Sequence, residues 1–443
     1  MIELKATFGT VNFDDWLNRL KKDLRSDDLR ELQFNDEIED LIYVSYNSAS
    51  NSPKQTIQPG DFPYTRNFNR PLNEWKNAAR ISADNDKSVN SKALDVLMKG
   101  ADALIFELKK ESNLPELLNG IGLEYIHSLF MVSDTDQAID VLKGPVKVSP
   151  ETVSIGLDPL IHSDAFKPEL LDNLKNVQIP VYLADGFRVQ QCGANITQEL
   201  AFMLSTANEC LYHLVNNGLT ADQASACIHF RVGIGSNYFM EIAKFRALRT
   251  LWSEVVKAYN PVHSCSYNCR ITATTGNMNK SAKDPHTNLL RQTTEALSAL
   301  LGGAEVLHIE AHDSYTSKGP SALAERMAMN ISLILKEESY MDKVIDALGG
   351  SYTVEALTAN ISQKAWSLFQ QLDSSGGILE QKALEPFLDQ VRQKGQQRLE
   401  TYRTGKRTLI GVNKFPNPKT EENAFLPVGQ YLGIPEIIFE RDI

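Results

Sequence analysis

Several features that would place the chain in a specialised class are missing from its 443 residues. No run reaches the roughly 18–20 consecutive apolar residues that a membrane-spanning helix needs, and the start shows no basic segment followed by an apolar core. The net charge is −11, whereas a broad nucleic-acid surface is normally basic. We therefore expect a cytoplasmic protein that binds neither a membrane nor nucleic acid.

Cysteine is scarce, and its five residues form an odd, scattered set: Cys192, Cys210, Cys227, Cys265 and Cys269. Reduced thiols fit this set better than a disulfide framework does. Cys265 and Cys269 have a metal-ligand spacing, but no second pair joins them, so a zinc signature is incomplete. The turn at 233–235 lacks the third glycine of a dinucleotide fingerprint, and no phosphate-loop spacing occurs.

The clearest positive signal is the stretch 228–252, IHFRVGIGSNYFMEIAKFRALRTLW. Its first seven residues alternate and are rich in β-prone types, which predicts a strand. Gly233 and Gly235 then allow a tight turn. From Phe245 to Tyr259 apolar residues recur at steps of three and four, which predicts a helix. The stretch is therefore a β-turn-α unit.

The same plan recurs along the chain. Strands are expected at 101–106, 123–131, 152–157, 179–184, 226–233, 266–272, 304–310 and, weakly, 343–346. Helices are expected at 91–99, 114–120, 136–142, 198–216, 239–258, 288–301 and 321–336. Eight strands alternating with helices predict an α/β fold with a parallel sheet, and eight is the number that closes a TIM barrel. An open doubly wound sheet is the alternative.

Three regions are expected. Residues 1–74 form an N-terminal extension, with a charged helix at 13–32 and a strand at 40–46, that packs on the barrel or on a partner. Residues 75–350 form the βα barrel. Residues 351–443 form a C-terminal helical region, with helices at 354–371 and 379–402, an extended piece at 407–412 and a polar tail.

Long runs of the sequence resemble the barrel domain of methylmalonyl-CoA mutases. They are NYFMEIAKFRALRTLW, DPHTNLLRQTTEALSALLGGAEVLHIEAHD, ERMAMNISLILKEESYMDKVIDALGGSYTVEALTANISQKAW, PGDFPYTR at 59–66 and WLNRLKKDL near the start. The resemblance covers nearly the whole chain. It implies an eight-fold βα barrel that threads an acyl-CoA along its axis, with adenosylcobalamin at the mouth for a radical rearrangement of the carbon skeleton.

The cobalamin-binding part of that family has no counterpart here. Family members bind the cofactor on a separate C-terminal domain through an Asp-x-His-x-x-Gly motif. The closest run, at 284–289, ends in leucine instead of glycine and lies inside the barrel segment. The chain also stops soon after the helices that follow the barrel. The resemblance therefore implies that a partner binds adenosylcobalamin and that this chain binds no cofactor.

A second departure lies at 185–194, DGFRVQQCGA, where catalytic members carry Ser-Gly-Tyr-His-Met-Gln-Glu-Ala-Gly-Ala. Phe187 stands in place of the tyrosine, and a phenyl ring offers no hydroxyl. Arg188 stands in place of the histidine, and a permanently charged guanidinium cannot replace an imidazole. Gln190 and Gly193 keep the frame of the loop. The catalytic site is therefore expected to be degenerate, with no catalytic residue on this chain.

The run VSIGLDPL at 153–160 also lacks the longer motif, bearing asparagine and arginine, that catalytic members show after their third strand. With this difference the chain looks more like the small, non-catalytic subunit of the heterodimeric bacterial enzymes.

His308, Glu310 and His312 alternate along one expected strand and would face the barrel interior together. Such a trio could ligate a metal, which supports an alternative hypothesis of a metal-dependent barrel hydrolase or lyase. A relic of a cofactor-facing strand is favoured, because His308 matches a family histidine and Glu310 replaces an asparagine. By the same resemblance, Gln190 and Asn330 are assigned to the barrel mouth, and no metal is expected.

Charged residues on the expected helices have two interpretations each. Lys244, Arg246 and Arg249 could contact CoA phosphates, but a solvated helix face is the commoner meaning of such charges. Glu337 and Glu338 could form an acid pair, but surface charge is the simpler interpretation.

The sequence thus predicts the small, non-catalytic subunit of an adenosylcobalamin-dependent methylmalonyl-CoA mutase. Its partner would be a large cobalamin-binding subunit that interconverts succinyl-CoA and methylmalonyl-CoA, and an acyl-CoA is a further candidate ligand. The alternatives are an active mutase that borrows a cobalamin domain from another chain, the metal-dependent enzyme, and a self-associating scaffold without chemistry.

Overall fold

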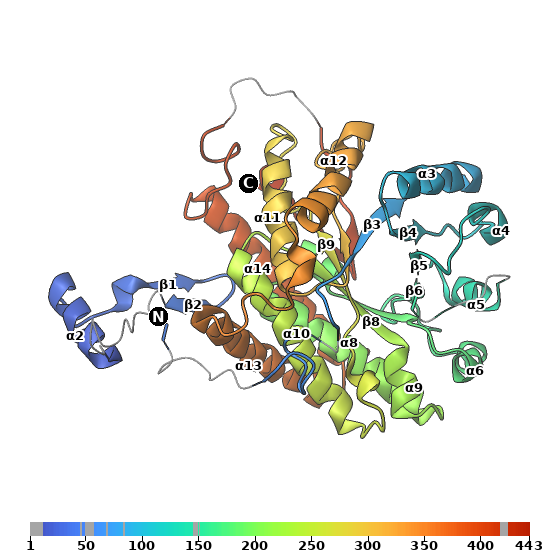
Figure 1. Cartoon of the computed structure of the whole chain (residues 1–443), viewed down its shortest axis with the longest axis horizontal. Coiled ribbons are helices and arrows are strands. Elements are labelled where there is room, and N and C mark those ends of the chain that lie inside the picture. The colour runs from blue at the N-terminus through green and yellow to red at the C-terminus, as the bar shows by residue number, and fades with distance from the viewer. Residues whose placement is uncertain are drawn as a thin grey trace, which may run out of the picture.

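Eight parallel strands form a barrel at the centre of the fold (Figure 1). The computed structural model describes residues 12–44, 47–48, 57–67, 70–82, 85–144, 149, 151–416 and 424–443. The hydrogen-bonded order is β6-β5-β4-β3-β10-β9-β8-β7. A parallel bridge between Leu157 and Tyr182 joins the two end strands, and Leu183 N donates to Leu157 O at 2.9 Å. The sheet therefore closes into the predicted barrel and is not the open alternative.

The barrel strands are β3 Lys76–Ile81, β4 Ala103–Glu107, β5 His127–Met131, β6 Val153–Gly156, β7 Tyr182–Asp185, β8 Ile228–Ile234, β9 Ile271–Thr275 and β10 Val306–His308. The barrel helices are α3 Asp86–Met98, α4 Leu114–Leu117, α5 Thr135–Lys143, α6 Pro168–Asn176, α7 Gly186–Gln191, α8 Ile196–Asn216, α9 Ala221–Ala226, α10 Tyr238–Ala258, α11 Thr287–Leu301 and α12 Ala322–Leu333. The remaining helices and strands are α2 Phe13–Leu24, β1 Gln33–Asp36, β2 Leu41–Val44, α13 Tyr352–Ser374, α14 Gln381–Arg403, β11 Gln430–Tyr431, β12 Ile434–Pro435 and α15 Phe439–Asp442.

One strand prediction is wrong. Residues 341–343 form a short 3₁₀ helix, no strand follows at 343–346, and the remaining barrel strand is instead β3. The pattern of β3 is obscured because Lys76 and Arg80 interrupt its apolar residues. Its neighbours in the sheet are β4 and β10, so β3 is a full member of the barrel.

The charged N-terminal helix is shorter than the expected 13–32. Asn12 Oδ1 caps α2 by accepting from Asp15 N at 2.8 Å, and the helix ends where Arg25 adopts a left-handed conformation, φ 54°. The β1–β2 hairpin follows, and α13 packs against β2. The last two residues of the expected strand at 40–46 lie outside the described residues. Among the helices that the structure describes, none is long and apolar enough to cross a membrane.

Helix α10 is buried on nearly all sides, because α8, α11 and α13 pack around it. Lys244, Arg246 and Arg249 are therefore neither solvated nor free to bind phosphate, so both interpretations made from the sequence are wrong. Lys244 pairs with Glu199, and Arg246 Nη2 lies 2.6 Å from Glu355 Oε1. Arg249 Nη1 donates to Gly302 O at 2.7 Å. These charges join elements of the barrel wall to each other.

Candidate functional site: the two ends of the barrel

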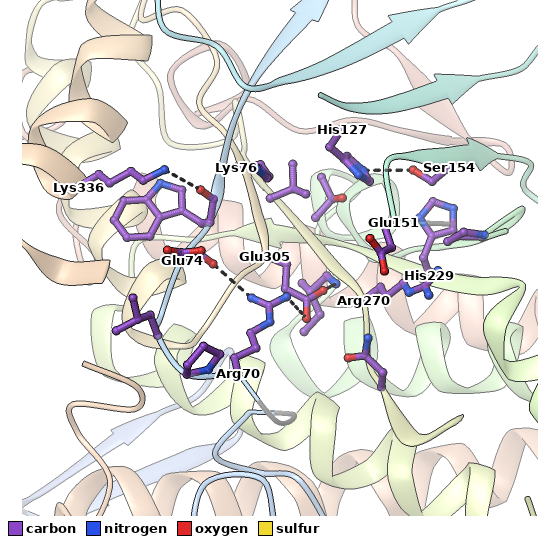
Figure 2. A pocket seen from close by; sticks show the side chains of 18 residues that line it. Arg70, Glu74, Lys76, His127, Glu151, Ser154, His229, Arg270, Glu305 and Lys336 are labelled. Atoms are coloured by element: carbon purple, nitrogen blue, oxygen red, sulfur yellow. Dashed lines mark hydrogen bonds and ion pairs between the residues drawn. The ribbon is translucent and has the colours of Figure 1, made fainter. Parts of the chain in front are cut away.

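A cavity of about 520 Å³ opens at the amino ends of the barrel strands. Lys336 lies on one side of it, and His127, Ser154 and His229 lie on the other (Figure 2). Four basic and three acidic side chains line this amino-end cavity: Arg70, Lys76, Arg270, Lys336, Glu74, Glu151 and Glu305. Its charges are therefore nearly balanced, with a small basic excess.

Two of these charges pair with each other, whereas one buried donor lacks a hydrogen-bond partner in the described part of the chain. Arg70 Nη2 lies 2.6 Å from Glu305 Oε1, and His127 Nε2 lies 3.3 Å from Ser154 Oγ. Arg270 Nη1 is buried without a hydrogen-bond partner among the described residues. Burial lowers the pKa of His127 to about 4 and that of His229 to about 3, so both imidazoles are neutral at pH 7.

Apolar side chains fill the barrel axis beyond this cavity. They form a cluster separate from the main core, made of Ala78, Ala103, Ile105, Leu129 and Val306 with Met131 packed against it. In-register pairing of β3, β4 and β5 puts these residues on one face of the sheet, which is the inside of the barrel. A Cβ added at Gly156 would lie 2.5 Å from Met131 Sδ, so Met131 lies directly over that glycine. This cluster, the axial plug, lies between the two ends of the barrel on the side of β3, β4, β5 and β10.

Charged side chains gather at the carboxyl end, or mouth, of the barrel. Arg80 lies 2.6 Å from Glu107 and 2.9 Å from Glu310, and this group remains partly exposed. On the opposite side, Arg231 Nε donates to Asp185 Oδ1 at 3.0 Å in a buried pair. The mouth is thus a set of ion pairs between neighbouring strands.

The loop at 185–194 lies at this mouth and contains α7. The guanidinium of Arg231 lies 5.0 Å from the centre of the Phe187 ring, a cation–π distance. Arg188 points toward the C-terminal hairpin β11–β12: its Nη2 donates to Gln430 O at 3.2 Å, and its Cζ lies 4.5 Å from the centre of the Tyr431 ring. Phe187 and Arg188 therefore both make contacts within the chain.

Asp158, just beyond β6, is buried beside this loop. Tyr431 Oη donates to Asp158 Oδ2 at 2.7 Å, and Leu160 N donates to Oδ1 at 3.0 Å. Burial raises the pKa of Asp158 to about 6, although these hydrogen bonds and Arg188 oppose the shift, whereas Asp185 adds to it. Asp158 belongs to the run at 153–160, but its burial against Tyr431 could not be anticipated, because the two residues are 273 positions apart.

The raised pKa of Asp158 predicts a pH-dependent stability. The pKa of this carboxyl rises from 3.8, the value of an unperturbed aspartate, to about 6 in the folded protein. Ionising the buried carboxyl therefore lowers the stability of the fold as the pH rises through this interval. An Asp158→Asn variant lacks this cost, so its stability relative to the wild type should increase by about 1 kcal/mol between pH 5 and pH 7.5. Urea unfolding at several pH values measures this difference.

The control is Asp27→Asn, at a side chain that is 97% exposed. That variant should follow the pH dependence of the wild type. If the Asp158→Asn curve also runs parallel to the wild type, Asp158 is ionised over the whole range and its raised pKa is refuted.

The structure does not assemble the metal trio. Strand β10 ends at His308, so the alternation breaks before the other two residues. Glu310 turns to Arg80, and His312 lies beside His286, with ring centres 5.5 Å apart. Among the described residues, no group of three or more His, Cys, Asp or Glu side chains could hold a metal. The metal-dependent enzyme is therefore not supported.

The other residues assigned to the mouth lie in different places. Gln190 is buried at the mouth, where a Cβ on Gly233 would come within 2.7 Å of its Oε1. Asn330 is instead in the last turn of α12, on the outside of the barrel. The preceding Met329 O accepts from Asn77 Nδ2 at 3.4 Å, at the start of β3. Asn330 therefore lies near the amino end of the barrel, away from Gln190.

Adenosylcobalamin does not fit the residues at this mouth. His286 is at the N-cap position of α11 and is exposed, and Asp284 Oδ2 accepts from Thr287 Oγ1 at 2.6 Å, so Asp284 is engaged with Thr287 instead of orienting His286 as the carboxylate partner of a metal-binding histidine would. The cavity next to Gln190 holds only about 30 Å³.

The fold and these two ends define the class: a closed eight-stranded βα barrel with a ligand-sized cavity at its amino end and a filled axis. The family model described as methylmalonyl-CoA mutase matches residues 172–431. The methylmalonyl-CoA mutase small subunit of Porphyromonas gingivalis is 33% identical over 447 residues, covering 94% of this chain and 71% of that protein. The chain therefore belongs to the methylmalonyl-CoA mutase family.

Other relatives match a shorter part. The methylmalonyl-CoA mutase of Escherichia coli is 34% identical over 245 residues, or 55% of this chain and 34% of that protein. The methylmalonyl-CoA mutase large subunit of Porphyromonas gingivalis is 33% identical over 241 residues, or 53% of this chain and 33% of that protein. The chain thus aligns with about a third of the length of these two relatives.

Proposed function

We propose that this chain is the non-catalytic small subunit of a cytoplasmic methylmalonyl-CoA mutase. The observation that carries the proposal is the chemistry and the contacts of the side chains of Phe187 and Arg188. Neither side chain supplies the hydroxyl or the imidazole expected at these positions, and Arg188 is already engaged with Tyr431 and Gln430. A guanidinium held in this way neither switches its charge nor serves as a general acid at neutral pH.

The proposed partner is a large subunit that binds adenosylcobalamin and interconverts succinyl-CoA and methylmalonyl-CoA. Support comes from the separate proteins named small and large subunit in Porphyromonas gingivalis, both of which are similar to this chain. In this proposal the small subunit contributes stability and shape to the heterodimer, and the cofactor stays on the partner.

We propose that Gln190, His308 and Glu310 are relics of a ligand-facing mouth that now serve the fold. His308 is buried, and burial lowers its pKa, so it is neutral at pH 7. Burial opposes the ionisation of Glu310, but Arg80 and His308 lower its pKa overall. The axial plug argues against threading an acyl-CoA through this barrel, so the proposed place for such a ligand on this chain is the amino-end cavity.

Reconstitution tests the proposed function. Each subunit is purified alone, and the two are then mixed in the presence of adenosylcobalamin. We expect the small chain alone to show no isomerisation of methylmalonyl-CoA, the two chains to co-elute in size-exclusion chromatography, and the complex to be active. The reason is that only the partner carries the cofactor and the catalytic pair.

The variant Phe187→Tyr/Arg188→His is the matched control for the lost pair. It should remain inactive alone, because the axial plug still blocks the approach of a thioester. Isomerisation by the purified wild-type chain with added cofactor would overturn the non-catalytic assignment.

A further inference from the structure

The C-terminal end of the chain returns to the mouth of the barrel. Leu426 N donates to Tyr315 O at 2.9 Å, in the segment after β10. Ile437 N donates to Gln191 O at 2.9 Å, after β7, and Phe439 N donates to Met278 O at 2.8 Å, after β9. Because all the strands are parallel, these segments lie at one end of the barrel. Residues 424–443 therefore cover the part of the mouth above β6, β7, β9 and β10.

The hairpin β11–β12 turns two apolar side chains into the protein. Tyr431 and Ile434 are each only 2% exposed. The Tyr431 ring lies 6.0 Å from Phe202 and carries the Arg188 guanidinium on its face, while its hydroxyl donates to Asp158. One tyrosine thus joins the hairpin to the loops after β6 and β7.

The second strand of the hairpin covers a thiol. Cys192 Sγ donates to Ile434 O at 3.4 Å, and Cys192 is 1% exposed. Burial raises the pKa of this thiol to about 12. Beside it, Gly193 and Gly395 lie in backbone contact under Ile437. The hairpin is therefore packed onto the loop that carries Arg188, without a gap.

We propose that residues 429–437 are an intramolecular cap on this half of the mouth and that Arg188 is the positioning residue that holds it. The cap occupies the face that a corrin ring would need in order to approach positions 187 and 188. The inference rests on the proposed function in one respect: Arg188 is taken to have no part in catalysis. It adds that this residue has a different task, which is to hold Tyr431 and Gln430.

On the opposite side of the mouth, the described residues leave some side chains partly exposed. Arg80 and Glu107, on β3 and β4, have side chains that are 41% and 39% exposed. The backbone and ring contacts of the cap are made with the loop that carries Arg188, while Glu436 lies near enough to Arg80 for that guanidinium to oppose the rise of its pKa.

Thiol labelling tests the cap on the full chain. The wild type and its variants are pulsed with N-ethylmaleimide, and peptide mass spectrometry gives a rate for each cysteine. Cys265 is exposed and should react first, whereas Cys192, Cys210 and Cys269 are buried and should react slowly. In Arg188→Ala, opening of the cap should raise the Cys192 rate by at least about ten-fold and leave Cys210 and Cys269 within about two-fold.

Three further variants separate positioning from general stability. Arg188→Lys keeps the cation and should restore most of the protection of Cys192. Tyr431→Phe removes only the hydroxyl, so it should increase the labelling rate of Cys192 by less than Arg188→Ala does. If Arg188→Ala does not fold, Tyr431→Phe provides the test. Arg392→Ala, at a side chain that is 40% exposed on α14, should label like the wild type.

Two results would overturn the cap: fast labelling of Cys192 in the wild type, or variants at 188 and 431 that leave Cys192 unchanged or expose all buried cysteines equally. Saturating adenosylcobalamin should not change the wild-type Cys192 rate, and a change would count against the cap. These readouts need no large subunit. A failed reconstitution would therefore refute the proposed function without deciding the cap, and the reverse also holds.

Discussion

The variant Lys244→Met is expected to lose about 3–5 kcal/mol of unfolding free energy, because it removes the cation from a buried cluster of charges. Lys244 is fully buried, and its Nζ lies 2.8 Å from Glu199 Oε2 and 2.7 Å from Glu241 Oε2. It also donates to Gly233 O at 2.5 Å. Burial works to lower the pKa of Lys244, but the two carboxylates raise it overall. The lysine is therefore charged, and its loss leaves two acids buried without a counterion.

Urea unfolding with a shared m-value measures this loss. The matched control is Lys257→Met on the same helix, where the side chain is 57% exposed and pairs with Glu254 at 3.4 Å. That variant should stay within about 0.5 kcal/mol of the wild type, because exposed pairs contribute little.

The carboxylates of the cluster give a second readout. Burial raises the pKa of Glu199 to about 7, against the effect of Lys244. Without the lysine, both acids should take up protons, so Lys244→Met should recover stability as the pH falls below 7. A variant as stable as the wild type at pH 8 would show that the cluster does not hold a buried charge.

The variant Gly193→Ala is expected to lose about 3–5 kcal/mol, from a backbone penalty and a collision together. Gly193 has φ 104°, a conformation that residues with a Cβ rarely adopt. A Cβ there would lie 2.6 Å from Gly395 Cα and 2.9 Å from Ile437 Cδ1. The Cα of Gly395 is a backbone atom of α14, so no side-chain rotation can relieve the clash.

The matched control is Gly218→Ala, with φ 95° and no atom within 4 Å of an added Cβ. It should lose only about 1–2 kcal/mol, the backbone penalty alone. Thermal or urea unfolding of the two variants gives the difference that belongs to the contact between Gly193 and α14. Equal losses would show that α14 yields easily and that the contact is loose.

The barrel could be predicted from the sequence because its strands are short apolar runs separated by amphipathic helices. β8 shows why: all seven of its residues are buried, and a glycine turn and a helix follow. β3 was missed because alternate residues such as Arg80 point into the axis, where Glu107 and Glu310 supply partners that local sequence does not reveal. The charges of α10 were misassigned for the same reason, since Asp346 and Glu355 come from a distant part of the chain.

The candidate site was predictable only in part. The loop at 185–194 was found by its resemblance to a family motif, and it does lie at the barrel mouth. The use of Arg188 was not predictable, since its partners Gln430 and Tyr431 lie far along the sequence in a tail that shows no periodic pattern. The amino-end cavity was missed because residues such as Arg270 and His229 come singly from the starts of different strands.

The hairpin that lies over the loop after β7 belongs to the same polypeptide as the loop itself. A tethered segment acts at an effective local concentration on the order of millimolar, whatever the amount of protein in the cell. A free ligand at micromolar concentration that needs the same face therefore competes at a disadvantage of roughly a thousand-fold, before any contact is counted. Dilution does not release the hairpin, so the closed state of this face is a fixed property of each molecule.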